Sequence, residues 1–190
     1  MEEESIRFSL LRGRNNSRLT KSYRLNDRGG IRKESAPNFS DGTAETKCIN
    51  KLSDLESEID NLKSNECIST GVFDSPSCEI ITSNKLSEER HTEGVRSRTK
   101  KYMVQPSKGI ALLDYDPSPY MPDHLRCDSP DALMSKLKKA IPGFVFAGYS
   151  GAGSCSSGIT VTATGEPYQG GGGLHVYIAV KGIDLGSIYL

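Results

Sequence analysis

The stretch GIALLDYDP, residues 109–117, indicates the fold of the second half of this chain. A short apolar run bounded by glycine and proline is typical of a buried β-strand, here one that ends at residues 113–116. Side chains two apart in a strand point to the same face of a sheet. Asp114 and Asp116 are therefore predicted to project side by side, with Tyr115 on the opposite face.

This aspartate pair has two interpretations. Two carboxylates that lie close together repel each other, which raises their pKa values unless a cation sits between them. A hard divalent ion such as Mg²⁺ or Mn²⁺, bound by one or two carboxylates and by substrate phosphates, relieves this repulsion. Aspartates that only cap the turn before Pro117 are the alternative, and the pair alone leaves both interpretations open.

The sequence beyond the aspartates predicts a helix and three more strands. Ser129-Pro130-Asp131 begins the helix with a capping residue, a proline in the first turn and an acid near the positive end of the helix dipole. Residues 141–143, Ile-Pro-Gly, end it. Strands are predicted over 144–147, 159–163 and 174–180. This order indicates an α+β domain with a mixed, largely antiparallel sheet and flanking helices.

His175 lies in the last predicted strand, directly after four consecutive glycines at 170–173. A histidine on a sheet face is often only satisfied by a neighbour. A run of glycines forms a loose hairpin tip or lets the backbone approach a ligand closely. The small residues at 150–158 could surround phosphate oxygens with N–H groups and hydroxyls, or they could form a plain connection. They match neither of the phosphate-loop motifs GxxxxGK(S/T) and GxGxxG. Cys155 has no assignable base, which argues against a nucleophilic role.

Upstream, residues 1–63 are predicted to form a small basic unit of strands and turns followed by a helix. The strand candidates are 6–11, 19–25 and 31–34, with a turn at 27–30. Leu52, Leu55, Ile59 and Leu62 recur at helical spacing and would form one face of an amphipathic helix. Residues 64–108 are polar and without periodicity, which predicts a linker or surface segment. Residues 109–190 then form the third predicted region.

The net charge is zero, with 24 basic and 24 acidic residues, so the field of the whole molecule does not attract nucleic acid. The cations are nevertheless concentrated between Arg7 and Lys33, where Asp27 is the only acid. Such a cluster can neutralise backbone phosphates, and a solvated basic arm is equally consistent with it. The candidate contacts to nucleic acid are Arg12, Arg14, Arg18, Lys21 and Arg24.

Composition excludes several other classes of protein. The five cysteines are odd in number, widely spaced and without a CxxC pair, which argues against a zinc ribbon and a disulfide framework. A hydrophobic share of 35% without tryptophan predicts one modest core and looser segments. The sequence has no secretion signal and no apolar run near the roughly 18 residues that span a bilayer. We therefore expect a cytoplasmic protein that does not bind membranes.

Four motifs in order resemble the archaeo-eukaryotic primase superfamily, especially the primase-polymerases of plasmids, prophages and other mobile genetic elements. They are LLDYDP at 112–117, SCSSGI at 154–159, Gly165-Glu166, and GLHVYI at 173–178. Residues 18–21, 40–45 and the predicted helix after them also resemble the N-terminal region of these primases. The resemblance implies that Asp114 and Asp116 bind catalytic Mg²⁺ or Mn²⁺. It further implies that His175 contacts the incoming nucleotide, with Ser156 and Ser157 as weaker candidates.

The activity implied by this resemblance is template-directed joining of nucleoside triphosphates on single-stranded DNA, as in a DNA primase, with a replicative helicase as a further partner. The sequence departs from the family in two places. Gly173 stands where serine is typical. The chain also ends about fifteen residues after His175, before the third motif of the family, a hydrophobic residue followed by an acid that completes the metal site. Ile183-Asp184 resembles this motif but follows the histidine strand too closely, so residues 109–190 are expected to be a partial catalytic domain. We therefore expect a truncated primase, and a non-catalytic nucleic-acid-binding or replication-accessory remnant is the alternative.

Overall fold

The computed structural model describes residues 5–27, 31–35, 38–88, 93–118, 120–141, 148–154, 157, 159–160, 164–166 and 173–182. The chain divides into two compact units, residues 1–110 with 180–190, and residues 111–179. Within the described residues the main sheet has eight strands in the order β11-β12-β10-β1-β4-β7-β8, with β5 beside β1. It is mixed and largely antiparallel, which confirms the predicted α+β class.

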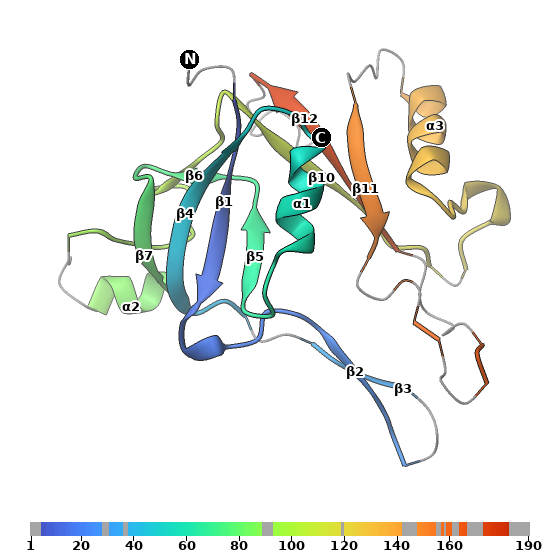
Figure 1. The fold of residues 1–190 in the computed structure, drawn as a ribbon, viewed down its shortest axis with the longest axis horizontal. Coiled ribbons are helices and arrows are strands. Elements are labelled where there is room, and N and C mark those ends of the chain that lie inside the picture. Colours follow the sequence, from blue (N-terminus) through green and yellow to red (C-terminus); the bar gives the residue numbers. More distant parts are fainter. Residues whose placement is uncertain are drawn as a thin grey trace. The chain divides into compact units, whose positions relative to one another are not determined.

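The elements follow one another along the chain as Figure 1 shows. The strands are β1 (Ile6–Gly13), β2 (Ser22–Leu25), β3 (Ile31–Glu34), β4 (Asp41–Ile49), β5 (Glu66–Ser69), β6 (Val72–Phe73), β7 (Ser77–Ile81), β8 (Val95–Arg96), β9 (Met103–Val104), β10 (Lys108–Tyr115), β11 (Tyr149–Gly153) and β12 (Leu174–Lys181). The helices are α1 (Asp54–Asp60), α2 (Ser83–Glu88) and α3 (Pro130–Ala140), with short 3-10 turns at Arg14–Asn16 and Asp123–Leu125.

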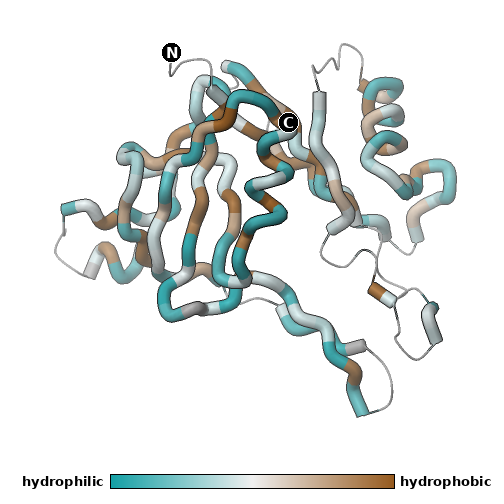
Figure 2. The backbone as a smooth tube through the Cα atoms, viewed as in Figure 1, coloured by the Kyte–Doolittle hydropathy of each residue, from teal (hydrophilic) through white to brown (hydrophobic). Residues whose placement is uncertain are grey.

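The first unit is built on β1, whose expected strand at 6–11 is present. β1 pairs with β4 along its whole length and with β5 along its second half, both antiparallel. It also lies parallel to the start of β10. Phe8 and Leu11 of β1 are fully buried, and Leu11 packs with Phe73 and Ile80 in the hydrophobic core. In Figure 2 apolar stretches (brown) alternate with polar ones along these strands, as expected for strands that bury one face.

The segment 64–108 differs from the expected linker. It forms β5 to β9 and α2, and it contributes buried Val72, Phe73 and Ile80 to the first unit. Its strands are only two to five residues long and are separated by polar residues. Segments this short carry too few alternations to produce a periodic pattern. Pairing stabilises them instead: β5 pairs with β1, β7 with β4, β8 with β7, and β6 with β9.

The predicted strands of the basic region are present as β2 and β3, which pair with each other in a two-stranded sheet. The predicted helix is α1, but it has only seven residues, and of its apolar face Leu55 alone is fully buried while Leu52, Ile59 and Leu62 are half-buried. Strand β4 had no counterpart in the sequence-based expectation, because its residues DGTAETKCI are largely polar.

The second unit contains α3, β11 and most of the strands β10 and β12. α3 begins as predicted, with the Ala132 N–H donating to the Ser129 hydroxyl at 3.3 Å and Pro130 in the first turn. Leu133 and Met134 pack against β12 in the second hydrophobic core. No helix in the described parts of the chain is long and apolar enough to cross a membrane.

The strands expected between α3 and β12 differ from the one that the structure describes there. The predicted strand at 144–147 lies outside the described residues, as do residues 161–163 of the strand expected at 159–163. β11 falls partly in the Ser/Gly stretch that was expected to be a loop, and its five residues pair in register with Leu174–Ile178 of β12. Glycine and serine have little intrinsic preference for strands, so this pairing rather than local propensity accounts for the strand.

Candidate functional site

The sheet of the second unit has two chemically different faces. Leu113 and Tyr115 of β10 pack into the core that α3 covers, whereas Asp114 and Asp116 are exposed. This alternation is the one predicted from the two-residue period of a strand. On β12, Leu174 and Val176 belong to the same core, so His175 and Tyr177 lie on the face that carries Asp114.

Asp114 and His175 meet on this polar face. The His175 Nε2 atom lies 3.4 Å from the Asp114 Oδ1 atom, and the two residues come from strands that are neighbours in the sheet. Their side chains are 34% and 63% exposed, respectively. The contact is an ion pair only when the imidazole is protonated. Because more than half of the Asp114 side chain remains exposed, its carboxylate is also accessible to a ligand.

Tyr177 is a neighbour of this pair that the sequence did not suggest. Burial raises the pKa of the Tyr177 hydroxyl, and the negative charge of Asp114 raises it further. The available signal was its position two residues after His175, which places both side chains on one face of a strand. The polar face therefore combines a carboxylate, an imidazole and a phenol.

The two aspartates have the chemistry to hold a hard divalent cation. Carboxylate oxygens are preferred ligands of Mg²⁺, which usually takes one or two of them and completes its coordination with water and substrate phosphates. Within the described residues, no group of three or more His, Cys, Asp or Glu side chains is placed to hold a metal ion. To bind a metal ion, Asp114 and Asp116 would therefore need additional oxygen ligands from a substrate. The phosphates of a nucleotide could supply them.

The Ser/Gly segment holds the beginning of β12. The Ser157 hydroxyl donates to the Gly173 carbonyl at 2.6 Å, and the Ser154 N–H donates to the same oxygen at 2.7 Å. Ser157, expected as a weak nucleotide contact, thus has a structural bond next to His175. Ser156, the other weak candidate, lies outside the described residues.

Gly173 occupies the position where the resembling family has serine. A Cβ atom there would lie 2.7 Å from the Ser154 Oγ atom and 3.2 Å from the Tyr115 carbonyl oxygen. Both distances are shorter than ordinary van der Waals contacts. Glycine therefore allows the chain before His175 to pass close to the end of β10.

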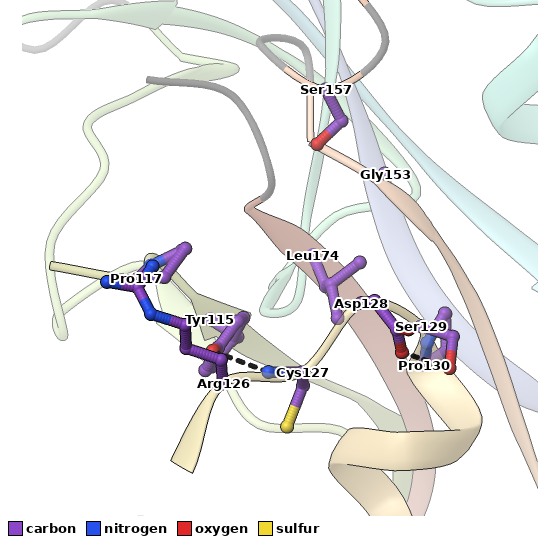
Figure 3. Close-up of a pocket in the computed structure, with 10 residues that line it drawn as sticks. All are labelled: Tyr115, Pro117, Arg126, Cys127, Asp128, Ser129, Pro130, Gly153, Ser157 and Leu174. Carbon is purple, nitrogen blue, oxygen red and sulfur yellow. Dashed lines mark hydrogen bonds between the residues drawn. The ribbon is translucent and has the colours of Figure 1, made fainter. Parts of the chain in front are cut away.

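A cavity of about 670 Å³ lies in the second unit near the start of α3 (Figure 3). Its lining residues are Tyr115, Pro117, Arg126, Cys127, Asp128, Ser129, Pro130, Gly153, Ser157 and Leu174. The Cys127 N–H donates to the Tyr115 hydroxyl at 2.8 Å, which joins the end of β10 to the segment before α3. Arg126 supplies a cation to this wall and was not singled out from the sequence. Its position three residues before the helix cap was the available signal.

The five basic residues predicted to contact nucleic acid fall into two groups. The Arg12 Nε atom lies 2.8 Å from an oxygen of Glu66, whose side chain is 5% exposed, and Arg14 pairs with Glu79 at 3.3 Å. Arg12 and Arg14 are thus engaged by acids of their own unit. Arg18, Lys21 and Arg24 lie on the segment that enters and forms β2, where Lys21 and Arg24 are exposed and the Arg24 Nε atom lies 3.8 Å from Glu34.

Comparison with known proteins identifies no relative. No family model, no curated protein and no solved structure matches the chain. The assignment of the site therefore depends on its own geometry: two exposed carboxylates at the end of one strand and a histidine on the neighbouring strand.

Proposed function

We propose that this chain is a nucleotidyltransferase of the primase-polymerase type, which joins nucleoside triphosphates on a single-stranded DNA template. The observation that carries the proposal is the contact between Asp114 and His175, with exposed Asp116 directly after the end of β10. These residues come from two motifs far apart in the sequence. Their meeting on one face supports a common role in binding a metal and a nucleotide.

Each residue of this group has a distinct role in the proposal. Asp114 and Asp116 would hold Mg²⁺ or Mn²⁺, which when bound neutralises the triphosphate and activates the attacking hydroxyl. His175 directs its Nε2 atom toward Asp114, which orients the ring, and in its protonated form the imidazole also donates from Nδ1 to a phosphate oxygen. Tyr177 lines the same face, close enough to Asp114 for the carboxylate charge to raise the pKa of its hydroxyl.

The proposed partners follow from the basic residues of the first unit and from the family resemblance. Lys21 and Arg24 are exposed and would contact the phosphates of the template, which makes binding dependent on salt and largely independent of sequence. A cytoplasmic location, a mobile genetic element as the source and a replicative helicase as a partner belong to the same proposal.

The proposal is tested by nucleotide incorporation on a primed single-stranded DNA template with Mg²⁺ or Mn²⁺. We expect the chain to extend the primer, and the variants Asp114→Asn and Asp116→Asn each to lose about 100-fold or more in rate, because removal of one electrostatic group at a reacting centre has effects of this size. Asp60→Asn, an exposed acid at the end of α1, is the matched control and should retain the rate. Incorporation that is equal in all four proteins would contradict the proposal.

A second candidate function is nucleic-acid binding without catalysis. It is favoured by the basic β2–β3 hairpin, whose cations lie in the first unit and need neither aspartate. Under this candidate the chain binds DNA but does not extend a primer. If the motifs are instead coincidental and the domain is unrelated to primases, Asp114→Ala and His175→Ala would change neither metal nor nucleotide affinity.

A further inference from the structure

The strands β2 and β3 form a ribbon that projects from the first unit. They pair with each other in a two-stranded sheet, and in Figure 1 this ribbon extends away from the sheet around β1. The Leu19 N–H, just before β2, donates to the Ser64 carbonyl at 2.7 Å and fixes the base of the ribbon. A two-stranded hairpin alone is marginally stable in water. A bound partner would therefore add stability that the ribbon itself lacks.

The register of the ribbon places like charges opposite each other. Arg24 pairs directly with Arg32, and cross-strand neighbours of the same sign destabilise an antiparallel sheet. Glu34 lies 3.8 Å from the Arg24 Nε atom and compensates part of this repulsion. The Arg24 side chain is nevertheless 71% exposed. An external anion between the two guanidinium groups would remove the remaining repulsion.

The opposite face of the ribbon also carries a cation. Lys33 is opposite Tyr23 in the register, and its side chain is exposed. The whole segment 17–35 is strongly basic, with Arg18, Lys21, Arg24, Arg28, Arg32 and Lys33 against Asp27 and Glu34. Positive charge thus lies on both faces of a narrow ribbon.

Positive charge on both faces favours contact with a groove of a nucleic acid over contact with a single flat surface. A ribbon that enters a groove of double-stranded DNA edge-on has one row of phosphates beside each face, so cations on both faces are used at once. The major groove of B-form DNA is about 12 Å wide and admits a two-stranded β-ribbon, whereas that of A-form RNA is deep and narrow. Single strands are bound mainly by stacking on exposed aromatic rings, and Tyr23 of the ribbon is half-buried.

We infer that the β2–β3 ribbon binds in the major groove of B-form double-stranded DNA. Arg24 and Arg32 contact the phosphates on one side of the groove, and Lys33 contacts those on the other. The inference rests on the proposed function for the choice of DNA as the polyanion, because a template-directed enzyme meets duplex once a primer is extended. It assigns the interaction with duplex to Arg32 and Lys33 in addition to Arg24, and it leaves Arg12 and Arg14 with their internal acids.

The test is fluorescence anisotropy of the full chain with labelled duplex DNA, single-stranded DNA and duplex RNA of equal length, without metal or nucleotide. We expect duplex DNA to bind most tightly. The double variant Arg24→Ala/Arg32→Ala should weaken duplex binding about tenfold at low salt and reduce the slope of log affinity against log salt by about 2, because two phosphate contacts are lost. Lys51→Ala/Lys85→Ala removes the same charge from other exposed positions of the first unit and should leave binding unchanged.

Further variants separate charge from folding. Arg24→Lys/Arg32→Lys keeps both charges and should keep the salt slope, and thermal unfolding checks that each variant is folded. Equal loss in the ribbon and control variants, no loss in the ribbon variant, or tighter binding of single-stranded DNA or duplex RNA would overturn the inference. Asp114→Asn/Asp116→Asn should retain duplex binding. Loss of nucleotide incorporation therefore tests the proposed catalysis, whereas loss of duplex affinity tests the ribbon interaction.

Discussion

Asp114 takes part in two electrostatic interactions on one sheet face. Its carboxylate contacts His175 at 3.4 Å, and its charge contributes to the raised pKa of Tyr177. A carboxylate that orients an imidazole and remains accessible can bind a cation without rearrangement of the strand. The residue is therefore the most informative position for probing the polar face.

The raised pKa of Tyr177 provides a test of this arrangement. Asp114→Asn should lower the Tyr177 pKa, but only part of the way to its ordinary value, because burial is the larger cause of the shift. The measurement is an NMR titration of ring-labelled tyrosines, with Tyr177→Phe to assign the signal. Asp116→Asn is the control and should move the pKa less. A Tyr177 pKa that does not respond to Asp114→Asn would show that the two side chains do not interact.

Glu66 is the residue at which stability should depend most clearly on acid pH. The Lys63 backbone N–H and the Arg12 guanidinium lower the pKa of this buried carboxyl below 4.5, against the opposing effect of burial. A lowered pKa in the folded state means that the stabilisation is present above the unfolded pKa and is lost as pH falls through the folded pKa. Its contribution should therefore be complete near neutral pH and decline below about pH 4.5.

Glu66→Gln should lower the free energy of unfolding at neutral pH by about 1–3 kcal/mol, because a buried charged hydrogen-bond network loses its acceptor charge. The loss should shrink as pH falls below the unfolded pKa. Urea unfolding between acid and neutral pH measures both effects. Glu79→Gln, which removes a partner from the exposed pair with Arg14, should cost less than about 1 kcal/mol. Equal losses for the two variants would contradict the distinction between buried and exposed pairs.

The helices and strands that the sequence predicted are those with strong local signals at their ends. β10 lies between glycine and proline, and α3 has the Ser129-Pro130 start, so both were predicted near their observed bounds. β12 followed from its continuous apolar run. β4 and β11 could not be predicted because their residues are polar or small, and pairing with neighbouring strands determines their conformation.

The start of α3 yields a direct test of the predicted cap. Ser129→Ala should lower the free energy of unfolding by about 1 kcal/mol, because the Ala132 N–H loses its acceptor. Ser135→Ala, an exposed position in the same helix, should cost nothing or stabilise slightly, since alanine favours helices. Urea unfolding compares the two variants. If both changes have the same effect, the hydroxyl of Ser129 does not cap the helix.

The candidate site was partly predictable for a related reason. The shared face of Asp114 and Asp116 follows from the period of a single strand, so it could be predicted from sequence. The contact between Asp114 and His175 depends on β10 and β12 being neighbours in the sheet, which a local pattern does not specify. Tyr177 was missed because its place beside Asp114 depends on the same strand pairing. Arg126 was missed because its place in the cavity wall depends on the tertiary fold.

The net charge of the whole molecule is zero, but the two units carry different charged groups. The first unit carries the basic ribbon β2–β3, and the second carries Asp114, Asp116 and His175. Each unit has its own hydrophobic core, around Leu11 and Ile80 in the first and around Met134 and Val176 in the second. The proposed DNA contacts therefore lie mainly in the first unit, and the proposed metal and nucleotide site lies in the second.

We propose that Asp114, Asp116 and His175 together bind a metal–nucleotide complex. The decisive measurement is isothermal titration of the full chain with a nucleoside triphosphate in the presence and absence of Mn²⁺. We predict binding that requires Mn²⁺, a loss of about tenfold or more in Asp114→Asn/Asp116→Asn, and a smaller loss in His175→Ala, because loss of a charge-assisted contact costs about 1.5–3 kcal/mol. Asp60→Asn should bind as the unaltered chain does. Nucleotide binding that is absent, independent of Mn²⁺ or unchanged in the double variant would contradict the account.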